Sequence, residues 1–143
     1  MGPPEELEAI SKISSELSEH LPDDWRSARF VVMFMGIYGM LNIYIKKEGG
    51  RIVQIELPAN FMMKSMELRA GMYKENEGSW FPWELRLWSE GRFKSRFNYD
   101  EYPPFSFSPG PEDFLEEMEI FPRGEEFIPD WLRVALGEDD RNS

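Results

Sequence analysis

Cysteine is missing from the 143 residues of this chain, and histidine occurs once, as His20. The chain therefore has no disulfide and no thiolate metal site, a composition that suits a reducing cytosol. The chain has almost no nitrogen or sulfur ligands for zinc, and His20 is the one histidine that could activate a nucleophile. His20 falls in the last turn of an expected helix, where a cation complements the helix dipole, so we expect a structural role for it.

Long apolar runs and a basic leader are missing as well. The longest apolar run, residues 30–41, has 12 residues, whereas a membrane span needs about 20. The first charged residues, Glu5, Glu6 and Glu8, are acidic, which is the opposite of the basic start of a signal peptide. We therefore expect a cytoplasmic protein with no membrane partner.

The motifs of the common catalytic sites are also absent. There is no G-x-S-x-G nucleophile elbow, and Gly36 and Gly39 lack the Lys-Ser/Thr that completes a phosphate-binding loop. The acids of 112–119 crowd one segment but lack the glycine and the alternating spacing of a calcium loop. We expect no enzyme, no metal site and no cofactor. A hydrolase that uses a pair of the 27 acids, with or without a metal, is the least favoured alternative.

Length and composition favour one packed domain over residues 1–143. A chain of this length can bury a substantial core, and 15% of its residues are aromatic. We expect disorder only at the ends, with residues 138–143 as a frayed acidic tail.

Four segments have the periodicity or the boundary residues of helices. Pro129 opens the last and shortest of them, and Gly137 closes it. The other three have apolar stripes: Leu7, Ile10, Ile13, Leu17 and Leu21 in the helix over 5–21; Met62, Met66, Ala70 and Tyr73 in the helix over 61–73; and Phe114, Leu115, Met118 and Phe121 in the helix over 111–121.

Five segments read as strands. Residues 29–35, 40–46 and 51–57 follow one another with short glycine-containing links, which favours an antiparallel meander. Residues 83–88 and 93–99 alternate apolar and polar side chains around Ser89-Glu90-Gly91, which is typical of a β-hairpin. The expected fold is α+β: one antiparallel sheet of about five strands covered by helices, in the order α-βββ-α-ββ-αα.

The net charge of −11 is unevenly distributed along the chain. Residues 1–24 hold seven acids and one base, residues 25–109 nine acids and twelve bases, and residues 110–143 eleven acids and three bases. An acidic surface repels nucleic acids and anionic membranes and attracts basic partners. Acidity of this kind also serves solubility, so charge alone does not select a function.

The basic face of the expected hairpin raises the question of nucleic-acid binding. Its residues would offer phosphate contacts and a stacking group: Arg86, Trp88, Arg92, Lys94 and Arg96. Basic residues on an exposed strand also discourage edge-to-edge pairing, and here the acidic terminal helices could neutralise them. The net charge would also deprive a nucleic-acid binder of long-range attraction. We therefore expect no direct nucleic-acid binding.

Recognition of another protein is the function that these patterns favour. Exposed acidic helices would meet a basic partner, and exposed aromatic rings would serve as anchors. The candidate contact residues are the acids Glu112, Asp113, Glu116, Glu117, Glu119, Glu125, Glu126 and Asp130, the nearby Asp100 and Glu101, and the aromatic residues Trp88 and Tyr102.

Several motifs of the C-terminal half resemble the YezG-like family of bacterial immunity proteins, the antitoxins paired with secreted polymorphic toxins. After the Trp-rich hairpin these are Glu90-Gly91-Arg92-Phe93, Phe97-Asn98-Tyr99-Asp100, Glu112-Asp113-Phe114-Leu115, Phe121-Pro122-Arg123 and Ile128-Pro129-Asp130-Trp131-Leu132. The resemblance is clearest over residues 80–133, and before that it rests on the order of elements.

The resemblance implies a cytoplasmic inhibitor without catalytic residues, which binds a cognate toxin domain. Toxins of such systems are often nucleases, whose clefts are basic because they hold a polyanion, and an acidic inhibitor can cover such a cleft. The alternative function is an adaptor or regulatory module that binds a protein other than a toxin.

Overall fold

The computed structural model describes residues 1–106 and 108–137, so the expected tail at 138–143 lies outside the described part. The expected order α-βββ-α-ββ-αα is confirmed, with a short 3-10 helix added before the last α-helix. The elements are α1 (Pro3–Ser18), β1 (Trp25–Met35), β2 (Tyr38–Lys47), β3 (Ile52–Gln54), α2 (Asn60–Gly71), β4 (Pro82–Trp88), β5 (Phe93–Phe97), α3 (Pro111–Ile120), η1 (Glu125–Phe127) and α4 (Asp130–Ala135).

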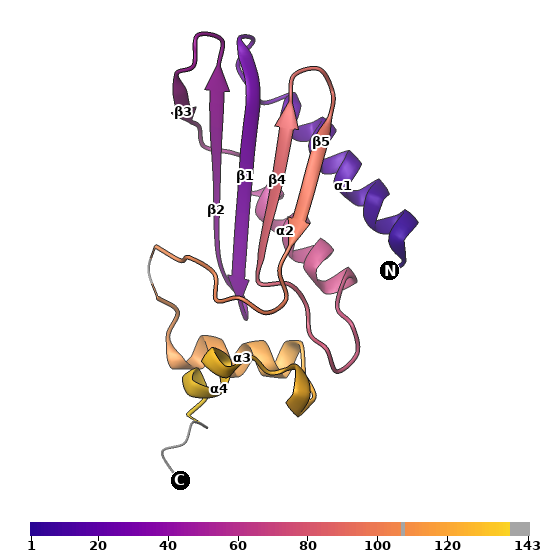
Figure 1. Cartoon of the computed structure of the whole chain (residues 1–143), viewed down its shortest axis with the longest axis vertical. Helices are drawn as coiled ribbons and strands as arrows, with labels where there is room; N and C mark the ends of the chain where they lie inside the picture. Colours follow the sequence, from indigo (N-terminus) through magenta and orange to yellow (C-terminus); the bar gives the residue numbers. More distant parts are fainter. Residues whose placement is uncertain (107, 138–143) are drawn as a thin grey trace.

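The five strands form one antiparallel sheet in the order β3-β2-β1-β4-β5. β1 is the central strand, and its Phe30 lies between Ile43 of β2 and Leu85 of β4. β1 also carries the most continuous apolar run, and its last four residues, 32–35, are all buried, which fits a strand end covered on both faces. α2 follows the edge strand β3 and leads the chain back to β4 on the other side of β1 (Figure 1).

Helices α1 and α2 lie against one face of the sheet, where most of the hydrophobic core is found (Figure 1). The ring of Trp83 stacks on Phe97 at 5.4 Å and meets Phe30 edge-on at 5.5 Å. The indole N–H of Trp83 donates to the hydroxyl of Ser95 at 2.7 Å, so its one polar group is satisfied. The hairpin that the alternation predicted therefore supplies the centre of the core.

The stripe expected for the first helix is buried except at its first residue, and the stripe expected for α2 is only partly buried. In α1 the predicted core residue Leu7 is 59% exposed. In α2 the fully buried residues are Phe61, Ser65, Leu68 and Arg69; of the predicted stripe, Met62 and Met66 are half-buried against the core, whereas Ala70 is exposed. Rotation of α2 places its largest apolar ring, Phe61, in the core and directs Arg69 towards α3.

Smaller differences concern the ends of elements. β3 spans three residues rather than the expected seven, and Pro58, which has no N–H to donate, lies beyond its end. His20 lies beyond the end of α1, and its ring meets Phe61 edge-on at 5.3 Å. Pro129 is the N-cap of α4, one residue before the expected position.

In the described part of the chain, no helix lies against the other face of the sheet (Figure 1). The lower part of this face carries the segment after β5: the ring of Phe105 lies tilted against that of Tyr38 at 5.3 Å, and the N–H of Ser106 contacts the sulfur of Met40. Helices α3 and α4 lie at the lower end of the sheet, next to the β1–β2 turn, around a second small core of Met35, Phe81, Phe114 and Leu132. None of the helices in the described part is long and apolar enough to cross a membrane.

Gly36, in the β1–β2 turn, permits the close approach of α3 to the sheet. Its φ is +62°, and a Cβ there would lie 2.8 Å from the carbonyl oxygen of Asp113. Gly36→Ala should lower the free energy of unfolding by about 2–4 kcal/mol, through backbone strain and this clash. Urea denaturation of the variant measures the effect.

Gly91→Ala is the matched control, because Gly91 also has a positive φ (+105°) but nothing within 4 Å of the added carbon. It should cost about 1–2 kcal/mol, from backbone strain alone. An equal loss in the two variants would show that contact with α3 contributes nothing at Gly36.

Candidate protein-binding surface at the helical end

A buried ion pair between Arg69 of α2 and Glu117 of α3 attaches the C-terminal helices to the sheet. The guanidinium Nη2 lies 2.6 Å from Glu117 Oε2, and the two side chains are 2% and 0% exposed. Arg69 Nε also donates to the carbonyl of Trp80 at 2.6 Å, and the N–H of Gly36 donates to Glu117 Oε1 at 2.8 Å. Burial lowers the pKa of Arg69, and the charge of Glu117 opposes this shift.

A second arginine joins the 3-10 helix to the loop before β4. Arg123 donates through Nη1 to the carbonyl of Phe127 at 2.8 Å and through Nη2 to that of Ser79 at 2.9 Å. Its guanidinium lies over the ring of Phe81 at 4.7 Å. Burial lowers the pKa of Arg123, with Glu117 opposing the shift. The two arginines therefore hold α3 and η1 in fixed positions.

The prediction that Glu117 belongs to an exposed acidic face is wrong, because the side chain is fully buried. Phe114, Glu117 and Phe121 have the spacing of one helix face, and this face packs on the end of the sheet. Leu115, which the sequence placed in the apolar stripe, is instead 57% exposed. A charged residue occupies this buried position because Arg69 supplies the opposite charge there.

The outer ridge of α3 has Leu115 surrounded by carboxylates. Glu112, Leu115, Glu116 and Glu119 are spaced i, i+3, i+4 and i+7, which places them on one side of the helix. The N–H of Ile37 in the β1–β2 turn donates to Glu116 Oε1 at 3.1 Å, and the Ile37 side chain is 62% exposed. Acidic and apolar groups therefore alternate on this ridge.

Some predicted acids have structural partners of their own. Asp113 Oδ2 accepts the N–H of Gly110 at 2.8 Å and so caps the start of α3. Glu125 is exposed and pairs with Arg133 of α4, with 3.2 Å between Oε1 and Nη1. Glu126 and Asp130 are exposed as well.

The loop after β5 brings the remaining predicted acids to the same end. The indole N–H of Trp131 in α4 donates to the carbonyl of Asp100 at 2.6 Å. The ring of Tyr102 meets that of Trp131 edge-on at 5.3 Å and is 42% exposed. Asp100 and Glu101 are both exposed, and Asn98 Oδ1 accepts the N–H groups of both at 2.8 Å. We call α3, η1, α4, residues 100–102 and Ile37 the helical end.

Trp88, the remaining predicted contact residue, does not lie at the helical end. β4 starts at Pro82, next to Phe81, whose ring meets Trp131 at 5.0 Å. Trp88 ends that strand, about 20 Å farther along. The structure therefore separates Trp88 from the acids with which the sequence grouped it.

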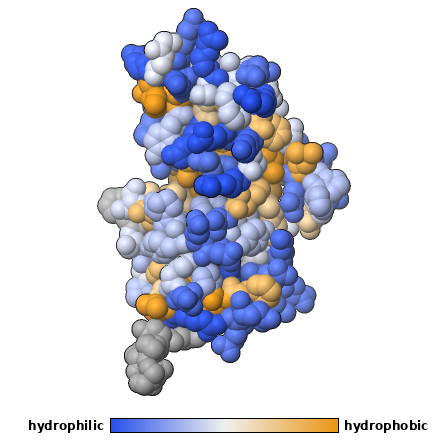
Figure 2. Space-filling model, viewed as in Figure 1, coloured by the Kyte–Doolittle hydropathy of each residue, from blue (hydrophilic) through white to orange (hydrophobic). Residues whose placement is uncertain are grey.

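The helical end also gathers exposed apolar side chains, of which the sequence predicted only Tyr102. Ten large hydrophobic side chains are exposed in the described part of the chain, and six lie at this end: Ile37, Tyr102, Leu115, Ile120, Phe127 and Val134. Figure 2 shows hydrophobic surface among hydrophilic surface over the lower end. The exposure of Leu115 follows from the burial of Glu117, because residues two apart lie on opposite sides of a helix.

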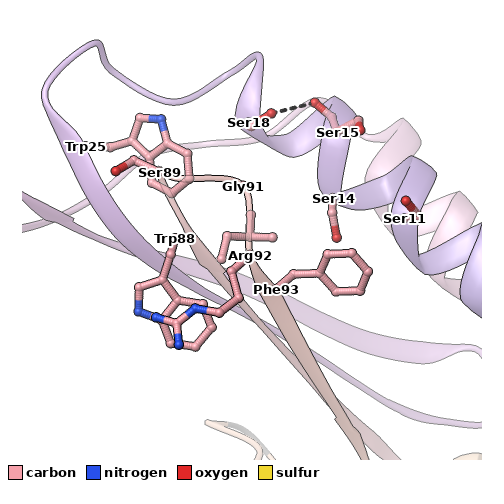
Figure 3. A pocket seen from close by; sticks show the side chains of 11 residues that line it. Ser11, Ser14, Ser15, Ser18, Trp25, Trp88, Ser89, Gly91, Arg92 and Phe93 are labelled. Atoms are coloured by element: carbon pink, nitrogen blue, oxygen red, sulfur yellow. Dashed lines mark hydrogen bonds between the residues drawn. The ribbon is translucent and has the colours of Figure 1, made fainter.

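The described residues offer no metal centre: no three histidine or acidic side chains among them gather closely enough to hold an ion. A cavity of about 190 Å³ lies between α1 and the β4–β5 turn (Figure 3). It is lined by serines of α1 and by rings such as Trp25 and Phe93, with no histidine or acid among its lining residues. The hydroxyl of Ser14 donates to the carbonyl of Ile10, and that of Ser18 to Ser15, so these two bond within the helix. This lining does not supply an acid–base pair.

No protein-family model matches this chain, and no curated protein matches it in sequence. The resemblance to YezG-like immunity proteins therefore rests on the motifs of residues 80–133.

The buried pair predicts unequal effects of two adjacent substitutions. Glu117→Gln leaves the Arg69 charge buried without its counter-ion and should cost about 3 kcal/mol of unfolding free energy. Glu116→Gln keeps an oxygen that can accept the Ile37 N–H and should cost less than about 1 kcal/mol. Urea denaturation compares the two, and equal losses would contradict the role assigned to the Arg69–Glu117 pair.

Proposed function

We propose that the protein is an immunity protein that binds a cognate toxin domain through the helical end and neutralises it without catalysis. The observation that carries the proposal is the coincidence of acids and exposed apolar side chains on one firmly attached end. The acids alone are compatible with solubility, but six exposed hydrophobic side chains beside them are typical of a docking surface.

The composition of the helical end suits a basic protein partner. Protein interfaces combine apolar anchors, which supply most of the affinity, with charged groups that steer association and set specificity. On α3 the anchor is Leu115, and the surrounding charges are Glu112, Glu116 and Glu119. A nuclease cleft has the complementary charge, and a standard interface would bury about 1,600 Å² in total.

The attachment of α3 makes the surface preorganised. Its inner face is fastened by the Glu117 bonds to Arg69 and Gly36, so its outer ridge keeps one position relative to Ile37. A surface that does not have to be ordered on binding loses less entropy and binds more tightly. Such an inhibitor would act in the cytoplasm of the cell that makes the toxin.

An adaptor or regulatory module would use the same surface with a partner that is not a toxin. Gene neighbourhood distinguishes the two, because immunity predicts that a large secreted-toxin gene adjoins this one. A carboxylate-dependent hydrolase is less favoured, since the acids of the α3 ridge have Leu115 among them and no three histidine or acidic side chains of the described residues gather in one metal site.

Leu115→Ala should weaken binding to the neighbouring toxin domain at least about tenfold, because an apolar anchor is lost. The fold should be little affected, since the side chain is 57% exposed. Affinity is measured by titration calorimetry, and stability by urea denaturation.

Leu7→Ala provides a matched control, because Leu7 also lies on a helix and is 59% exposed, but on α1. Its affinity for the toxin domain should equal that of the unmodified protein. An unchanged affinity of the Leu115→Ala protein would exclude the outer ridge of α3 as the contact.

A further inference from the structure

The upper part of the uncovered sheet face carries a concentration of positive charge. The strand register places Tyr44, Arg29, Arg86 and Lys94 side by side on four adjacent strands. Lys46 and Trp88 face Ser27 in the next row of the sheet, and Arg96 faces Glu84 in the row on the other side. We call this surface the basic face; its residues are Arg29, Tyr44, Lys46, Arg86, Trp88, Arg92, Lys94 and Arg96.

The arrangement of charge on the basic face favours a bound anion. Arg29 and Arg86 are directly opposite each other, which is destabilising for like charges. They share one carboxylate, Glu84, whose oxygens lie 3.0 Å from Arg29 Nη1 and 3.5 Å from Arg86 Nε. Lys46, Lys94 and Arg96 form no ion pair with any described residue. An anion laid across the strands would therefore meet cations that are not yet neutralised.

Two aromatic rings on this face each have a guanidinium group above them. Arg29 lies over the ring of Tyr44 at 5.1 Å, and Arg92 lies over that of Trp88 at 4.1 Å (Figure 3). Single-stranded nucleic acids are bound by cations that follow the phosphates and by aromatic rings or guanidinium planes on which the bases stack. Shallow depressions of about 400 and 230 Å³ lie on either side of Arg86 and Trp88.

The chemistry of the basic face suits nucleic acid better than an acidic protein. Four of its six cations are arginines, whose planar fork matches a phosphate group. A protein partner would need apolar anchors, but Ile52, which lies opposite Lys46, is the single exposed large hydrophobic residue on the described strands. The helical end has such anchors, and the basic face has stacked rings and guanidinium groups instead.

From the sequence we expected no nucleic-acid binding, because the net charge is negative and because the acidic helices could neutralise the basic residues of the hairpin. In the described residues the acids of these helices pair with Lys64, Arg69 and Arg133, and none pairs with a cation of the basic face. The acids of α1 lie behind the sheet, and Trp88 lies about 20 Å along β4 from the helical end. Salt screens charges beyond about 8 Å at physiological ionic strength, so the basic face acts through its local charge.

We propose that the basic face binds single-stranded nucleic acid, with phosphates on Arg86, Lys94 and Arg96 and bases stacked on the guanidinium groups of Arg29 and Arg92, which cover the rings of Tyr44 and Trp88. This goes beyond the proposed immunity function and uses a different surface, so either can fail without the other.

The test is fluorescence anisotropy of a labelled 15-nucleotide oligothymidylate titrated with the full chain. Binding should weaken with salt, with a slope of log K against log salt of about −2 for three phosphate contacts. Lys94→Glu combined with Arg96→Glu should weaken binding at least about tenfold, because both side chains are exposed and unpaired in the described structure. Absence of binding by the unmodified protein at low salt would overturn the proposal.

Lys12→Glu combined with Lys74→Glu is the matched control, since it changes the net charge equally at exposed positions on α1 and after α2. The control should bind like the unmodified protein, and an equal loss in both double variants would show that net charge alone governs binding.

Two further measurements separate nucleic acid from other polyanions. Trp88→Leu preserves all charges and should weaken oligothymidylate binding several-fold through lost stacking. Unlabelled oligothymidylate should displace the probe, and poly-glutamate at the same charge concentration should not. Equal displacement by poly-glutamate, together with full affinity of the Trp88→Leu protein, would identify a general polyanion or acidic-peptide surface and overturn the proposal.

Discussion

The salt bridge between Arg69 and Glu117 determines how the two parts of this molecule fit together. It joins α2, which packs on the covered face of the sheet, to α3, which lies at the end of the sheet. Each partner has a further bond, to the carbonyl of Trp80 and to the N–H of Gly36, so both buried charges are satisfied. Without this pair, α3 would keep a small apolar core, the Ile37 bond to Glu116 and the contacts of Arg123. The exposed ridge of α3 therefore depends on an interaction that is itself hidden from solvent.

This attachment produces two surfaces of opposite character. The helical end combines carboxylates with apolar anchors, as expected for a surface that binds a basic protein. The basic face lacks such anchors but has paired arginine and aromatic groups. The two surfaces lie at opposite ends of β4. An acidic chain can therefore carry a local positive field, because its acidic and basic residues lie on different elements.

Patterns within single segments were sufficient to predict the fold. Alternation predicted the hairpin with Trp83, and the links between the first three strands predicted the meander. The errors concern contacts between distant segments. Phe114 and Phe121 place Glu117 on an apolar face of its helix, but the sequence does not show which opposite charge permits its burial, because its partner Arg69 is 48 residues earlier. The basic face likewise unites Arg29 and Lys46 with the hairpin through a strand order that local periodicity does not specify.

The most direct test of the proposed immunity function is titration calorimetry of the unmodified protein with the neighbouring toxin domain at low and high salt. We predict nanomolar affinity that weakens markedly as salt rises, because the carboxylates of the helical end would face a basic surface. Tight binding that is independent of salt would contradict docking through these acids. Absence of binding at both salt concentrations would contradict the immunity function itself.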